Sequence, residues 1–132
     1  MSFRRLAPWM ICCWFGVASA AFVHLDLGDF DDDLMRDMDN AAKDLEPVIG
    51  ARNAEAAKED TEVLAHGFKW TEDYFVKKQT TPDAVQFAQD GAHALDQVLS
   101  LLEKQDFPAA AAAARDMTKT CRACHDVYKP PK

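Results

Sequence analysis

The residues with the clearest chemical potential lie close to the C-terminus, where two cysteines and a histidine form a CxxCH motif. Cys121 and Cys124 are three positions apart, and His125 follows directly. On a helix this spacing places both thiols about one turn apart, so that both can reach the same flat ligand. The motif is typical of haem c, in which two thioethers hold the porphyrin and the imidazole binds its iron. It predicts one covalently attached haem with His125 as an axial ligand.

The N-terminal residues have the pattern of a secretory signal peptide. Two arginines precede an apolar run over residues 9–17, and the small residues 18–20 follow it. The run is shorter than the roughly 20 residues that span a bilayer, which favours cleavage over a retained anchor. We therefore expect residues 1–20 to be removed on export to the periplasm. Residues 21–132 would remain as a single domain without a membrane anchor.

Cleavage after residue 20 would leave Cys121 and Cys124 as the two cysteines of the mature chain, because Cys12 and Cys13 lie in the removed segment. A disulfide between positions three apart would constrain little of the unfolded chain. A thioredoxin-like redox pair normally accompanies a βαβ pattern, which this sequence lacks. Zinc would need two further ligands, and the other histidines have no recognisable finger spacing. Haem attachment accounts for the motif best.

Composition and charge limit the possible partners. The 132 residues are 48% hydrophobic and 28% charged, as expected for a chain that folds around a core. The formal charge is −7, and it becomes −9 once the two arginines of residues 1–20 are removed. Without a basic stripe, nucleic acid is not expected as a partner. The acidic balance favours redox partner proteins with basic docking surfaces.

Helical periodicity predicts four amphipathic segments, and no run of alternating β-branched residues predicts a strand. The first segment covers residues 27–49, where apolar and small residues recur every three or four positions. Asp29 or Asp31 can cap its N-terminus, and Pro47 and Gly50 stop it near its end.

The other three segments follow after short connections. The second covers residues 53–76; its expected inward stripe is Ala57, Thr61, Leu64, Phe68, Thr71 and Phe75, widened by Val63, Trp70 and Tyr74. The third begins at Pro82, with Thr81 as its capping residue, and the fourth begins at Phe107. Four such helices predict an all-α fold, an antiparallel up-down-up-down four-helix bundle with covalently bound haem between facing helices.

This combination resembles the class II c-type cytochromes, the cytochrome c prime family. The resemblance covers nearly all of residues 27–129, and its most specific part is residues 121–129, CRACHDVYK. The family implies a bundle with haem on the last helix and its open face toward the first. Its members divide into five-coordinate forms with an apolar distal residue and low-spin forms with a methionine ligand from the first helix. Family members commonly dimerise, so a homodimer is a further possibility.

The sixth ligand of the iron depends on the first helix. Residues 34–37, Leu-Met-Arg-Asp, look like the low-spin members, and the resemblance implies that Met35 is the ligand. Periodicity alone points to Met38, which lies nearer the middle of the apolar stripe. A methionine at helical spacing is also a common core residue. His66 and His93 are further alternatives, and His24 is a weaker one.

Two positions depart from the family pattern. Asp31 stands where arginine is frequent, so a partner for a haem propionate must come from elsewhere, with Arg36 as a candidate. Lys129 stands in place of an arginine four residues after His125, and the planar guanidinium that can screen the imidazole is therefore lost.

The sequence thus predicts a non-enzymatic electron carrier whose haem iron is held by His125 and Met35. The main alternative is a five-coordinate cytochrome that binds NO or CO at an open distal site. A thiol oxidoreductase is the third class of function considered.

Overall fold

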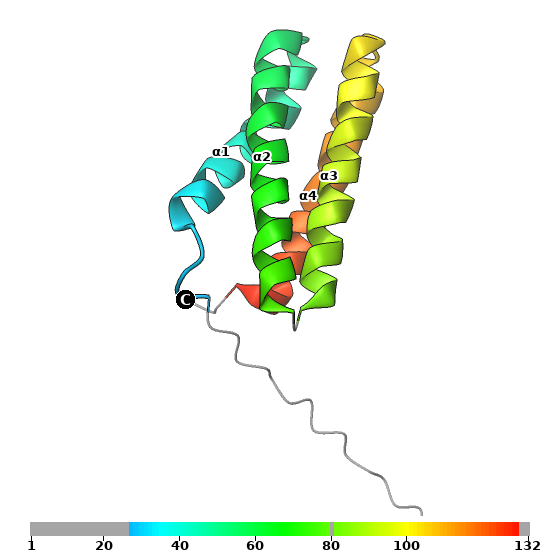
Figure 1. Ribbon diagram of the computed structural model, residues 1–132. Coiled ribbons are helices and arrows are strands. Elements are labelled where there is room, and N and C mark those ends of the chain that lie inside the picture. Colours follow the sequence, from blue (N-terminus) through cyan, green and yellow to red (C-terminus); the bar gives the residue numbers. More distant parts are fainter. Residues whose placement is uncertain (1–26, 80, 130–132) are drawn as a thin grey trace, which may run out of the picture.

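The computed structural model describes residues 27–79 and 81–129, which form four α-helices. They are α1 (Asp32–Gly50), α2 (Ala54–Lys78), α3 (Pro82–Glu103) and α4 (Phe107–Tyr128). Neighbours in the chain run in opposite directions and pack side by side, and α4 also packs against α1 (Figure 1). The predicted all-α four-helix bundle is confirmed. Within the described residues, no helix is long and apolar enough to cross a membrane.

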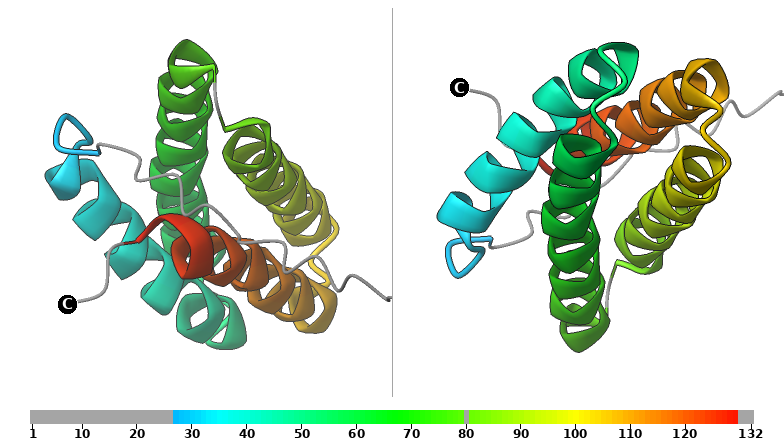
Figure 2. Two further views of the ribbon diagram at one scale, coloured as in Figure 1. Left: turned by 90° about the horizontal axis from the view of Figure 1, so that it is seen from below. Right: turned by 90° about the horizontal axis from the view of Figure 1, so that it is seen from above.

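The predicted signal peptide, residues 1–20, lies outside the described residues, and so does His24. Seen along its axis, the bundle has the helices in the order α1, α2, α3, α4, with the N-terminal end of α1 directed outward (Figure 2).

Three helices begin at a polar residue whose side chain satisfies a free backbone N–H of the first turn. Asp31, Asn53 and Asp106 accept hydrogen bonds from the N–H three residues further on, at 2.9, 3.2 and 3.2 Å. Thr81 is the N-cap residue of α3, as predicted, but it makes no side-chain capping bond, and its buried hydroxyl has no partner within the described residues. Pro82 begins that helix and has no N–H to satisfy.

The first helix starts later than its apolar pattern predicted. Residues 27–30 form a turn, in which the Phe30 N–H donates to the Leu27 carbonyl at 2.9 Å. Phe30 packs edge-on against Trp70 and Tyr74, with ring centroids 4.9 and 4.8 Å apart. Its apolar side chain is therefore used in tertiary contacts from a turn. At the other end, Pro47 lies inside α1, which continues to Gly50.

The core consists of one apolar stripe from each helix. The six residues of the stripe predicted for the second helix are all buried, which confirms the periodicity. Val63 was expected to widen that face but is 39% exposed. The largest side chains of the fully buried set are Leu45, Ile49, Leu64, Leu95 and Met117.

An aromatic cluster lies at the end of the bundle where α2 connects to α3. It consists of Phe30, Trp70, Tyr74, Phe75 and Tyr128. Both tyrosine hydroxyls donate to carboxylates, Tyr74 to Asp29 at 2.6 Å and Tyr128 to Asp83. These bonds tie the segment before α1 to α2, and the C-terminal end of α4 to the start of α3.

The cap of α4 can be tested by substitution. Replacement Asp106→Ala leaves the Ala109 N–H without its acceptor, and we expect it to lower the free energy of unfolding by about 1 kcal/mol. Asp106→Asn is the matched control, since asparagine caps about as well as aspartate. Urea denaturation of the three chains measures the difference. Equal losses in both variants would contradict the capping role.

Candidate functional site

A cavity of about 750 Å³ lies in the half of the bundle that ends at the α2–α3 connection. Its volume is in the range of small-molecule and cofactor sites. All four helices line it: α1 through residues 35–43, α2 through Phe68 and Thr71, α3 through Phe87 and Ala88, and α4 with its C-cap residue through residues 118–129. The cavity is therefore formed by the tertiary fold and not by one local motif.

The CxxCH residues lie in the last turns of α4, and Cys121, Cys124 and His125 all line this cavity. Met35 lines it from α1, 86 positions before Cys121. The structure thus brings together all four residues that the sequence selected: two thiols, an imidazole and a thioether.

Burial sets the protonation state of the two thiols. Both cysteines are free and partly buried. Desolvation raises the pKa of Cys121, and desolvation followed by the proximity of Cys121 raises the pKa of Cys124 to about 11. Cysteines that act in thiol redox chemistry have lowered pKa values, because the thiolate is the nucleophile. Both thiols are therefore protonated at neutral pH, which is unfavourable for a thiol oxidoreductase.

The pKa of the His125 imidazole is shifted in the direction that suits a metal ligand. Desolvation lowers the pKa of His125, and the positive charge of Lys129 lowers it further, while Asp39 and Asp126 act in the opposite direction. His125 is therefore neutral at pH 7, so that one ring nitrogen offers a lone pair. Metal binding requires this form.

The methionines differ in their surroundings. Met35 is half-buried and packs at the edge of the main core. Met38 also lines the cavity but is only 5% exposed and lies against Gly67 of α2. Met117, four residues before Cys121 on α4, is fully buried in the core. Two thioethers of α1 therefore border the cavity.

The cavity has both apolar and charged walls. Phe68 and Phe87 contribute rings, whereas Trp70, Tyr74 and Phe75 belong to the aromatic cluster. The charged groups that line the cavity are Lys43, Arg122, Lys129, Asp39 and Asp126. Lys43 pairs with Asp39 at 2.5 Å.

Sequence reasoning missed Lys43 and Arg122 as cations of the site. Arg36, which it favoured, is exposed and pairs with Asp33 at 2.9 Å. Lys43 lies eight residues after Met35, about two helical turns along the same face, so extension of that face would have found it.

The other histidines lie elsewhere. His66 and His93 are exposed on α2 and α3, and the His93 ring contacts Gln97 at 3.4 Å. In residues 27–79 and 81–129, no group of three His, Cys, Asp or Glu side chains is placed to hold a metal ion. A zinc site built from this part of the chain is therefore unsupported.

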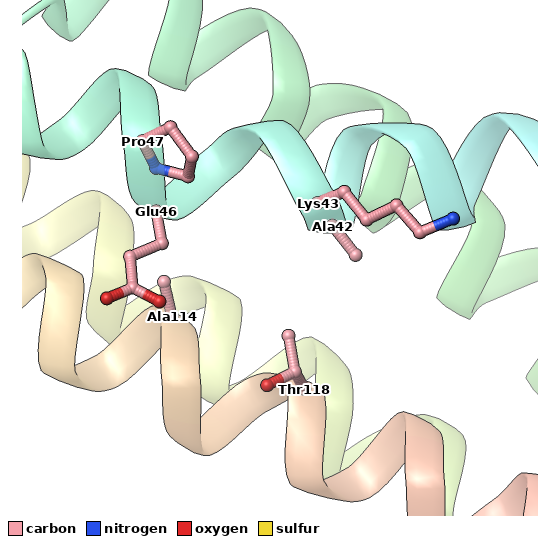
Figure 3. A pocket seen from close by; sticks show the side chains of 6 residues that line it. All are labelled: Ala42, Lys43, Glu46, Pro47, Ala114 and Thr118. Atoms are coloured by element: carbon pink, nitrogen blue, oxygen red, sulfur yellow. The ribbon is translucent and has the colours of Figure 1, made fainter.

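A groove of about 460 Å³ between α1 and α4 adjoins the cavity and shares Ala42, Lys43 and Thr118 with it. Ala42 and Ala114 line the space between the helices (Figure 3). Glu46 of α1 forms an ion pair with Arg115 of α4. The residues that line the groove include neither cysteine nor histidine, so the chemistry is concentrated in the cavity.

Comparisons with protein-family models, with curated proteins and with solved structures found no match for this chain. The chain is a four-helix all-α protein. Its cavity is lined by the CxxCH side chains and by two methionine thioethers.

The lowered pKa of His125 predicts how acid affects the haem-free chain. The unfolded histidine takes up a proton near its ordinary pKa of about 6.5, and the folded one does so only at lower pH. Acidification below about pH 6.5 therefore favours the unfolded state until the lowered pKa is passed. We expect His125→Gln to reduce the loss of unfolding free energy between about pH 7 and pH 5.

Urea denaturation at several pH values measures this slope. A His125→Gln chain with an unchanged slope would contradict the assigned pKa direction.

Proposed function

We propose that this protein is an exported c-type cytochrome that carries single electrons through one covalently bound haem. The observation that supports the proposal is the shared cavity, in which Cys121, Cys124 and His125 of α4 meet Met35 of α1. The resemblance of residues 121–129 to the class II c-type cytochromes agrees with this role and with the four-helix fold. Bound haem would supply one-electron chemistry between ferrous and ferric iron.

The two cysteines suit covalent attachment because they share a helix and face the same cavity. Their raised pKa values keep both thiols protonated, and disulfide formation requires a thiolate. The raised pKa values therefore slow disulfide formation between the two thiols, which favours the two thioether bonds.

His125 and Met35 are the proposed axial ligands. The neutral imidazole offers a nitrogen, and the thioether offers a soft, uncharged sulfur. Ligation by methionine and histidine raises the reduction potential, so this pair favours the ferrous state relative to two imidazoles. Phe68 and Phe87 would limit access of water to the macrocycle, and burial acts on the potential as well.

Lys43, Arg122 and Lys129 are the proposed partners of the haem propionates. All three line the cavity, and their positive charges complement carboxylates. Lys43 forms an exposed ion pair with Asp39, one turn before it on α1. The whole chain is acidic, with a formal charge of −7, or −9 after removal of residues 1–20, which favours redox partners with basic docking surfaces.

The visible spectrum of the purified protein tests this function and the sixth ligand together. We expect a low-spin spectrum with sharp α and β bands on reduction, and Met35→Ala should convert it to a high-spin form that binds CO. Met117→Leu is the matched control, because Met117 is buried in the core and its volume is nearly conserved. It should leave the spectrum unchanged.

A broad high-spin spectrum of the unaltered protein would instead indicate the five-coordinate form that binds NO or CO. A protein without a haem spectrum after expression in a host with cytochrome maturation machinery would contradict the proposed function.

A further inference from the structure

Two methionines of α1 border the cavity, and the residue behind Met38 distinguishes them. Met38 lies on Gly67, a buried glycine inside α2. A Cβ built on Gly67 would lie 2.2 Å from the Met38 Sδ, 2.4 Å from its Cγ and 2.7 Å from its Cε. Carbon atoms in van der Waals contact are about 3.5–4.0 Å apart. The end of the Met38 side chain therefore occupies the space that any other residue at position 67 would fill.

The backbone gives no other reason for glycine at this position. None of the glycines of the described residues has a positive φ, so Gly67 has a conformation that every residue adopts. Glycine is unfavourable in a helix interior relative to alanine. Space for Met38 is thus the property that glycine supplies here.

The same arrangement recurs on the next helix. A Cβ on Gly91 of α3 would lie 2.3 Å from the Phe68 Cε1 and 2.5 Å from its Cζ. Phe68 follows Gly67 directly and also lines the cavity. Two glycines therefore let two cavity-lining side chains lie flat against neighbouring helices.

We infer that Gly67 determines which methionine can serve as the iron ligand: it seats Met38 against the α2 backbone and leaves Met35 as the available thioether. This inference rests on the proposed haem site and assigns the choice between its two candidate ligands. Thr71, which shares this wall, donates its hydroxyl to the Gly67 carbonyl at 2.8 Å. The hydroxyl proton of Thr71 is therefore bound to the backbone of α2.

A side chain at position 67 would displace the Met38 side chain toward the cavity. The clashing atoms are the far end of a flexible, unbranched side chain, so Met38 can move while the helices stay in place. The cavity that Met38 already borders is the open space beside it. Gly67→Ala should therefore bring the Met38 thioether into the cavity.

NMR of the reduced holoprotein, with ¹³C-labelled methionine methyl groups, tests this. The porphyrin ring current shifts the methyl group of an axial methionine strongly upfield. We expect one such signal, which disappears in Met35→Leu, and a Met38 signal, assigned with Met38→Leu, outside that region. Gly67→Ala should shift the Met38 methyl upfield. Gly91→Ala is the matched control, because it makes the same change on α3 but displaces Phe68 instead.

Two results of these methyl spectra would overturn the inference: an axial signal that belongs to Met38, or a Met38 signal that Gly67→Ala leaves in place. A nuclear Overhauser contact between the Met38 methyl and the Gly67 Hα protons of the unaltered chain provides a second test that needs no variant. Its absence would also overturn the inference. If the chain carries no haem, no variant shows an upfield methyl signal, and the proposed function fails. The contact between Met38 and Gly67 still tests the position of the Met38 side chain in that case.

Discussion

The four helices must bury their apolar stripes against one another while they keep a cavity of about 750 Å³ in one half of the bundle. Protein interiors are otherwise packed as densely as organic crystals. The site therefore depends on keeping this cavity open while the rest of the bundle packs closely. Fully buried side chains such as Leu45, Ile49 and Leu64 fill the main core. The aromatic cluster and its two tyrosine–carboxylate bonds hold the end at the α2–α3 connection.

Burial beside the cavity gives the CxxCH side chains their chemical character. The same desolvation raises the pKa of the two thiols and lowers the pKa of His125, so that all three groups are uncharged at neutral pH. Uncharged thiols and a neutral imidazole suit thioether formation and iron ligation, whereas a thiol redox centre would need a thiolate. The local environment therefore distinguishes between functions that the spacing of the motif alone leaves open.

Much of the fold follows from the sequence because helical periodicity records burial directly. The stripe of α2 was predicted residue by residue. The choice of Met35 came from the family resemblance, because periodicity alone favoured Met38, and both methionines line the cavity. Properties that depend on tertiary neighbours were not predicted. Phe30 has helical spacing but packs on Trp70 from a turn. Thr81 is the N-cap of α3, but its hydroxyl makes no capping bond. The fit of Met38 to Gly67 likewise requires two helices to be placed first.

Intact mass spectrometry with peptide mapping, on protein exported from a host with cytochrome maturation machinery, tests the central claim most directly. The account predicts a chain heavier by one haem, with the added mass on the peptide that contains Cys121 and Cys124 and with neither thiol open to alkylation. A bare polypeptide with two alkylatable thiols at these positions would contradict it.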